Sequence, residues 1–319
     1  MSLARDMTAA KWFRIAGRYL AAVLVVLLGL RLWQLWERDP VDFHRVNAGF
    51  FGAAVLASVV AVSAYGLVWP FLLQRLGIQA SSAWVALFFK SQLGKYLPGS
   101  VWQYAGRIGL VRARGVPTQA ALISLVVEVA VSALAAGAVS VLVLPARWAI
   151  VVSLPLAAVV LIAGRRLATA RLPLPPRLDS ALVSRALHAL PAAGALYLLV
   201  WVAYGAAFWL TGRALFAVSI SELPRYTGVF AVSWLAGLVA VFAPGGIGVR
   251  EAVIVGLLGG RLGEPEAIVL AATSRIILTA VDLGAGALSL SLPRLRRRPT
   301  PSEPIDPPKP ATGRLGAPR

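Results

Sequence analysis

The sequence predicts an all-α polytopic membrane protein, with six full transmembrane helices and two re-entrant helical hairpins in an inverted repeat. Hydrophobic residues make up 59% of the 319 residues and charged residues only 14%, and the mean hydropathy is +0.77. A soluble domain has too little interior to bury that much apolar surface. The apolar residues also gather in long runs, and about 20 in a row are what a helix needs to cross a bilayer.

Six of the apolar runs are interpreted as full transmembrane helices. They cover residues 15–35, 48–73, 118–144, 149–164, 187–212 and 265–292. Basic residues precede the first run, but it is too long for the core of a signal peptide and no clear small-residue cleavage site follows it. We therefore expect it to be retained as the first helix.

The shorter apolar runs form two pairs, 82–97 with 100–113 and 227–243 with 247–259. Pro98-Gly99 interrupts the first pair and Pro244-Gly245 interrupts the second. A run of about 13 residues, at about 1.5 Å each, spans only about 20 Å. Proline lacks a backbone donor and glycine accepts unusual dihedral angles, so each interruption is predicted to be the tip of a re-entrant hairpin.

The distribution of Lys and Arg predicts which loops face the cytoplasm. Basic clusters at 5–18, 112–114, 165–185 and 294–319 alternate with loops in which the two signs balance. Cytoplasmic loops carry the positive excess, so both termini are placed inside, the first hairpin enters from the cytoplasm and the second from outside. The chain then divides into a cytoplasmic N-terminus, a transmembrane lipid-translocation domain and a disordered Pro/Arg-rich cytoplasmic tail, at 1–14, 15–292 and 293–319.

The segments 48–144 and 187–292 share one order: a full helix, a broken hairpin and a long closing helix. We expect the second copy to be inverted, because an odd number of full spans separates the two starts. Inverted repeats in secondary transporters surround a site near the bilayer midplane, and broken helices at that depth usually line a cavity. If each hairpin were instead two short full spans, the sidedness of the loops would be the same, so that alternative stays open.

The net charge of +18 indicates the kind of partner. Because the excess lies in loops and at the termini of a membrane protein, anionic membrane lipids are expected as partners and nucleic acid is not. The chain has no cysteine, and its histidines, His44 and His188, are isolated in sequence. No metal and no other cofactor is therefore expected.

Charged residues beside the two breaks are the candidate substrate-binding residues. A buried Arg or Lys costs about 2.5–3.5 kcal/mol on insertion, so it needs a partner or a wet cavity. We expect Arg250 to bind a lipid phosphate, because free N–H groups and the helix dipole at the start of 247–259 favour an anion. An ion pair with a neighbouring helix is its alternative role. The other predicted binding residues are Lys95, Gly99, Gln103, Arg107, Gly245, Gly246 and Glu251.

Interfacial snorkelling is the alternative for Lys95 and Arg107. Two carboxylates, Glu128 and Asp282, lie inside the closing helices, where a carboxylate can serve in proton coupling. The structural alternative is a fixed ion pair: Glu128 with Arg250 or Arg107, and Asp282 with Arg275, which lies seven residues before it on nearly the same helix face.

These residues closely resemble the lysylphosphatidylglycerol synthase transmembrane (flippase-domain) family. The resemblance covers about residues 15–292 and rests on Leu97-Pro98-Gly99 followed by Arg107 and Glu128, and on the more specific sequence 244–251. It implies a multi-pass protein of the bacterial or archaeal cytoplasmic membrane. Members fused to an aminoacyltransferase are linked to moving aminoacylated phosphatidylglycerol, and stand-alone members to hopanoid or polyprenyl-linked glycan pathways. We expect a stand-alone member without the aminoacyltransferase.

The sequence therefore favours a flippase that moves an anionic lipid between leaflets through a cationic midplane cavity. The lipid is a phospholipid, an aminoacyl-phospholipid or a polyprenyl-phosphate-linked lipid. A membrane-embedded glycosyl- or aminoacyltransferase, or its subunit, is the alternative, with Glu251 as a base. A third possibility is a non-transporting partner of a lipid-biosynthesis enzyme, and a homodimer is left open.

Overall fold

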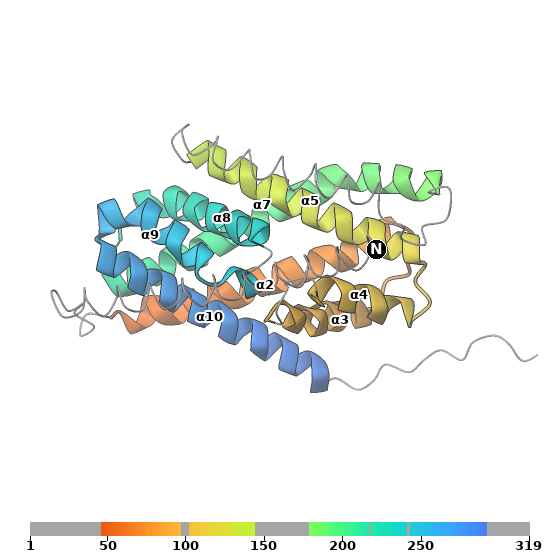
Figure 1. Ribbon diagram of the computed structural model, residues 1–319, viewed down its shortest axis with the longest axis horizontal. Helices are drawn as coiled ribbons and strands as arrows, with labels where there is room; N and C mark the ends of the chain where they lie inside the picture. Colours follow the sequence, from red (N-terminus) through yellow and green to blue (C-terminus); the bar gives the residue numbers. More distant parts are fainter. Residues whose placement is uncertain (1–45, 97–101, 144–178, 217, 241–242, 292–319) are drawn as a thin grey trace, which may run out of the picture.

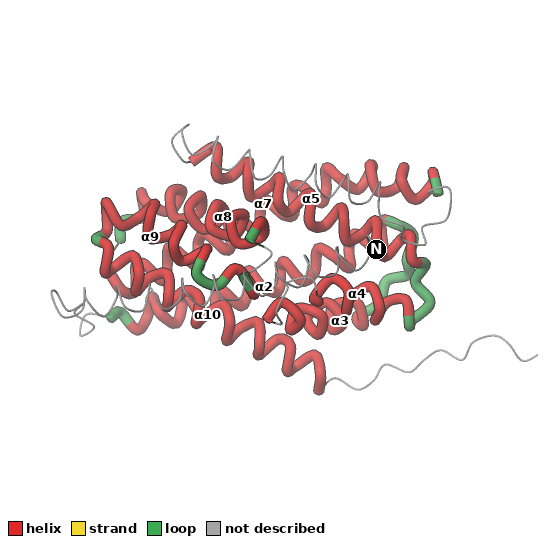
Figure 2. Tube along the Cα trace, viewed as in Figure 1, coloured by secondary structure: helices red, strands yellow, loops and turns green. Residues whose placement is uncertain are grey.

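The computed structural model describes residues 46–96, 102–143, 179–216, 218–240 and 243–291. Within these ranges the chain is helical and contains no strand (Figure 2). The predicted helices at 15–35 and 149–164, the break at Pro98-Gly99 and the tail lie outside the described residues. The structure is therefore that of an all-α protein over the part of the chain that carries the predicted hairpin arms.

Four helices are long and apolar enough to cross a bilayer: α2 (Ala48–Arg75), α5 (Thr118–Val143), α7 (Ser180–Phe216) and α10 (Glu264–Ser291). They confirm the long helices that the sequence predicts in these regions, although α7 begins seven residues earlier than the apolar run 187–212. Its first two turns are amphipathic rather than apolar, which is why hydropathy alone places the start too late. Asn47 caps α2, with its side-chain oxygen accepting from Phe50 N at 3.1 Å.

Two hairpins of shorter helices lie between the long ones. The first consists of α3 (Ser82–Gln92), the 3₁₀ turn η2 (Leu93–Tyr96) and α4 (Trp102–Arg112). The second consists of η3 (Ile220–Glu222), α8 (Leu223–Val239), the 3₁₀ turn η4 (Pro244–Gly246) and α9 (Val249–Leu262). Gly245 and Gly248 have φ of +58° and +84°, so the second break uses backbone conformations that favour glycine.

The hairpins lie at opposite ends of the long axis of the molecule (Figure 1). Each half of the described chain runs long helix, hairpin, long helix, and the contacts between the halves correspond: α5 packs on α8, and α10 packs on α3. The long helices α2 and α7 pack against each other between them. The inverted repeat itself stays a prediction, as do the remaining transmembrane helices.

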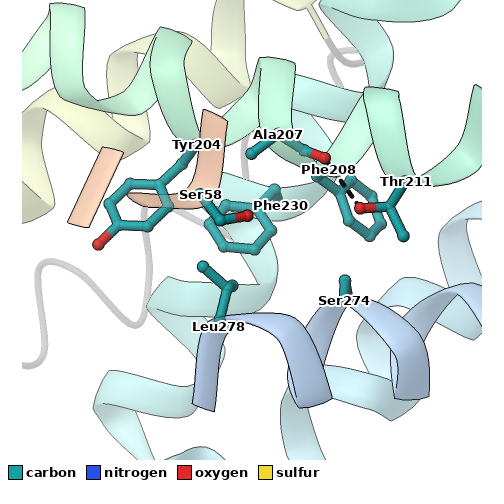
Figure 3. Close-up of a pocket in the computed structure, with 8 residues that line it drawn as sticks. All are labelled: Ser58, Tyr204, Ala207, Phe208, Thr211, Phe230, Ser274 and Leu278. Atoms are coloured by element: carbon teal, nitrogen blue, oxygen red, sulfur yellow. Dashed lines mark hydrogen bonds between the residues drawn. The ribbon is translucent and has the colours of Figure 1, made fainter. Parts of the chain in front are cut away.

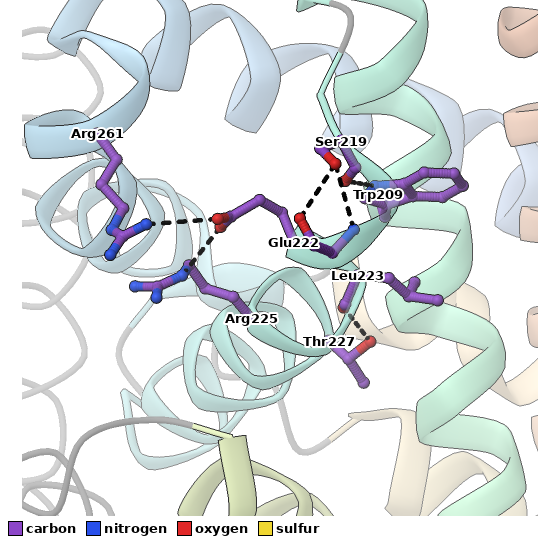
Figure 4. Close-up of polar contacts among 8 residues, drawn as sticks. Trp209, Ser219, Glu222, Leu223, Arg225, Thr227 and Arg261 are labelled. Carbon is purple, nitrogen blue, oxygen red and sulfur yellow. Dashed lines mark hydrogen bonds and ion pairs between the residues drawn. The ribbon is translucent and has the colours of Figure 1, made fainter.

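The two breaks meet in the middle of the molecule. The turns η2 and η4 are in contact, and the Lys95 carbonyl oxygen lies 3.7 Å from the position that a Cβ on Gly245 would occupy. At the far end of the second hairpin, Glu222 holds the start of α8 to the end of α9 (Figure 4). Its carboxylate lies 3.0 Å from Arg225 Nε and 3.3 Å from Arg261 Nη1. Both ends of this hairpin are thus fixed by charged side chains.

Aromatic side chains fill the core between α2, α7 and α8. Tyr204 stacks on Phe230 with ring centroids 5.5 Å apart, and Trp201 Nε1 donates to the Ser132 carbonyl at 2.9 Å. The outward faces of the long helices expose large apolar residues instead; Leu142 is 82% exposed and Leu56 66%. Such an outer surface suits a hydrocarbon environment better than water.

Substituting Gly205, at the α7–α8 crossing, tests this packing. A Cβ at Gly205 would overlap the Thr227 side chain, so Gly205→Val should destabilise the protein by about 1–3 kcal/mol through overpacking. The measurement is thermal unfolding of the detergent-solubilised protein. Gly194→Ala in the same helix is the matched control, because no atom lies within 4 Å of its Cβ position, and it should unfold at or above the wild-type temperature. Equal effects of the two variants would contradict the packing.

Candidate functional site

Five charged residues surround the point where the two breaks meet, and we call them the junction cluster. Lys95 comes from η2, Arg250 and Glu251 from the first turn of α9, and Arg275 and Asp282 from the middle of α10. Asp282, Arg250 and Arg275 interact electrostatically with Lys95, and Glu251 interacts with Arg250, so the five charges are close enough to influence one another. Four of these residues have side chains that are only 15–23% exposed.

Asp282 holds the first break to α10. Its Oδ2 lies 2.5 Å from Lys95 Nζ and accepts a hydrogen bond from the Tyr96 hydroxyl at 3.2 Å. The alternative in which Asp282 pairs with Arg275 is wrong, because Asp282 pairs with Lys95. The two side chains share a helix face, but η2 packs against α10 beside Asp282 and supplies a nearer cation. Lys95 is accordingly paired within the protein.

Arg275 holds the second break to the same helix. Its Nη2 donates to the Gly245 carbonyl oxygen at 2.7 Å, and its Nε lies 3.8 Å from Glu251 Oε1. The other oxygen of Glu251 accepts from Gly248 N at 2.6 Å. The start of α9 therefore already has an anion, and the predicted attraction of a substrate anion to free N–H groups there needs revision. One oxygen of Glu251 thus caps the start of α9, and the other faces Arg275.

Arg250 forms no hydrogen bond and no ion pair with the described residues. Its Nε is buried and unpartnered, and the residue as a whole is partly exposed. Two glycines make room for its side chain: a Cβ on Gly237 would lie 2.6 Å from Arg250 Nε, and one on Gly246 would lie 3.1 Å from it. Gly246 was expected at the site from the sequence. Gly237 was not expected there, because the neighbouring sequence does not show which glycines of α8 contact another segment.

Arg107 and Glu128 form a separate ion pair away from the junction. Both are about 1% exposed, and Arg107 Nη1 donates to Glu128 Oε2. Arg107 Nε also donates to Ser91 Oγ at 3.1 Å, and its guanidinium lies over the Phe88 ring at 4.3 Å from the centroid. This is one of the fixed pairs that the sequence allowed for Glu128. Neither snorkelling nor phosphate binding by Arg107 fits its burial, so we leave it out of the phosphate site.

The remaining predicted residues support the breaks. The Gln103 backbone passes so close to Gly94 that a Cβ there would lie 2.7 Å from Gln103 N. Gly245 supplies the carbonyl that Arg275 holds. Gly99 lies outside the described residues. No group of three metal-ligating side chains occurs among the described residues.

A small cavity is lined partly by α10, which also carries junction residues, but its lining is uncharged (Figure 3). Its volume is only about 10 Å³, and it lies among α2, α7, α8 and α10. Its serine and threonine hydroxyls donate to carbonyls of their own helices; Thr211 Oγ1, for example, donates to the Ala207 carbonyl at 2.9 Å. None of its lining residues is charged: Ser58, Tyr204, Ala207, Phe208, Thr211, Phe230, Ser274 and Leu278. It is therefore not the predicted cationic cavity.

A scan against protein-family models finds no match, and searches of curated proteins and of solved structures find none either. The resemblance to the flippase-domain family thus stays a prediction based on the residues themselves.

The Arg107–Glu128 pair predicts a strong non-additivity. Arg107→Leu leaves the Glu128 carboxylate buried without a partner, and should cost about 3–5 kcal/mol of stability. Glu128→Leu should cost a similar amount by stranding the guanidinium. The double variant should recover most of the loss, because two apolar side chains then replace two charges. Thermal unfolding in detergent measures all three, and additive losses would show that the two residues act independently.

Proposed function

We propose that the protein moves an anionic lipid headgroup between the leaflets of a bacterial or archaeal cytoplasmic membrane, as a stand-alone relative of the flippase-domain family. One observation carries the proposal: Arg250, at the meeting point of the two broken hairpins, has no partner among the described residues. A cation at membrane depth without a partner is costly, so its place is best explained by a ligand. Its guanidinium is suited to a phosphate, which it binds through two parallel hydrogen bonds.

The contact between the breaks supports re-entrant hairpins over pairs of short full spans. In the predicted topology the hairpins enter from opposite faces, so two short full spans each would carry their tips to opposite membrane surfaces, about 30 Å apart. Here the tips touch. The 11 residues of α3 also span only about 16 Å, roughly half of a hydrocarbon core. Re-entrant hairpins satisfy both facts.

The headgroup would pass the junction while the acyl or prenyl tails stay in the bilayer. Arg250 binds the phosphate, while Lys95 and Arg275 stay paired with Asp282 and Glu251. Alternating access requires one hairpin to move against α10 while the other stays attached, since Asp282 and Arg275 each hold a different break. The termini lie in the cytoplasm.

Removing the Arg250 charge tests the function. Purified protein in proteoliposomes should move fluorescent short-chain phosphatidylglycerol between leaflets, and Arg250→Ala should slow this at least about tenfold, since a charged hydrogen bond contributes about 1.5–3 kcal/mol. Leaflet exchange is followed by dithionite quenching. Arg261→Ala in the same helix is the matched control; its side chain is 60% exposed at the hairpin's far end, and it should transport normally. An inactive wild type would exclude this proposal.

Single cysteines test the opposite entry of the hairpins. The chain has no cysteine, so Ala113→Cys and Gly260→Cys, both at exposed positions, need no background substitutions. In intact cells a membrane-impermeant maleimide should label the Gly260 variant and leave the Ala113 variant unlabelled until the membrane is opened. Labelling of both from the same side would overturn the topology.

A further inference from the structure

The junction cluster carries one positive charge in excess. Lys95, Arg250 and Arg275 are its cations, and Glu251 and Asp282 are its carboxylates. Residues 97–101 and 241–242, which adjoin the cluster in the sequence, are all uncharged and do not change this balance.

The pairing within the cluster leaves the excess on a single side chain. Lys95 lies 2.5 Å from Asp282. Arg275 is held by the Gly245 carbonyl at 2.7 Å and by Glu251 at 3.8 Å. Arg250 alone has neither a carboxylate nor a carbonyl among the described residues. A ligand anion at the junction therefore meets one available guanidinium, together with two carboxylates that remain nearby.

We infer that the junction selects a headgroup with a single negative charge, a phosphodiester, over one with two or more, such as a diphosphate; this rests on the proposed function and names the substrate class of the same site. One planar guanidinium pairs with two oxygens of one phosphate and neutralises one charge. A second negative charge meets no unpaired cation among the described residues, because Lys95 and Arg275 are already paired with Asp282 and Glu251. Recruiting Lys95 instead would strand the Asp282 carboxylate, which is costly at this depth.

The geometry of Arg250 also limits the site to one phosphate. Its side chain lies against the backbones of Gly237 and Gly246: a methyl group would overlap it at Gly237 and would come within 3.1 Å of its Nε at Gly246. The stem is therefore confined, and the guanidinium has little freedom to follow a longer diphosphate. Selectivity arises from the confined stem and the charge balance together.

A series of variants that changes the charge of the junction tests this inference. Arg250→Gln lowers the excess to zero, Asp282→Asn raises it by one unit, and the double variant Lys95→Gln/Asp282→Asn restores the wild-type balance without the ion pair. Three fluorescent probes are compared in proteoliposomes: phosphatidylglycerol, a short-chain prenyl monophosphate glycoside and the corresponding diphosphate glycoside. The first two share the phosphodiester and distinguish a glycerophospholipid from a prenyl carrier.

The wild type should move at least one phosphodiester probe about tenfold or more faster than the diphosphate probe. Asp282→Asn should reduce this ratio to about threefold or less, and the double variant should return it to the wild-type value. A wild type that moves the diphosphate probe equally well or better overturns the inference while the proposed function stands. So does a double variant that behaves like Asp282→Asn, because the effect would then not follow charge.

A binding measurement keeps the two claims separate and does not depend on transport. Thermal unfolding of the full-length detergent-solubilised wild type is followed with glycerophosphoglycerol and with inorganic pyrophosphate. The phosphodiester should raise the unfolding temperature in the wild type and in the double variant, but not in Arg250→Gln. Greater stabilisation of the wild type by pyrophosphate overturns the inference. Binding as expected, with no movement of any lipid, would overturn the proposed function alone.

Discussion

The arrangement of the molecule depends on α10, which holds both broken hairpins at once. Arg275 and Asp282 are seven residues apart, about two helical turns and about 10 Å, and lie on nearly the same face. Each holds a different break: Asp282 binds Lys95 and Tyr96, and Arg275 binds Gly245 and Glu251. In the proposed topology the breaks lie at membrane depth, where an unsatisfied backbone group is costly, and Arg275 satisfies the Gly245 carbonyl directly.

Burial divides the ion pairs into two kinds. Arg107 and Glu128 are fully enclosed, with Phe88 stacked on the guanidinium, and such a pair fixes α4 to α5. The junction pairs remain partly exposed. Desolvation explains why the enclosed pair is fixed, because a fully buried charge must keep its partner. Both kinds of pair lie beside a hairpin, but only the junction pairs adjoin Arg250, whose Nε has no partner among the described residues.

Arg250 is unusual because the surrounding backbone leaves room for it while nothing described neutralises it. Gly237 comes from α8 and Gly246 from the turn η4 of the same hairpin, and both approach its side chain. The break, with its positive-φ glycines, brings these segments together. The break at η4 therefore ends α8, contacts η2 and positions Arg250. This link between backbone and charge is the basis of the proposed anion selectivity.

The sequence by itself determined the helices, the positions of the breaks and the list of charged residues near them. Hydropathy, and the dihedral preferences of proline and glycine, act over a few neighbouring residues, so the ends of α2, α5 and α10 are predicted within two residues. Only the tertiary structure decided which charges pair. Lys95 and Asp282 are 187 positions apart, and Gly237 has no local feature that relates it to Arg250. Pairing depends on distance in space, which is set by how α10 packs against both hairpins.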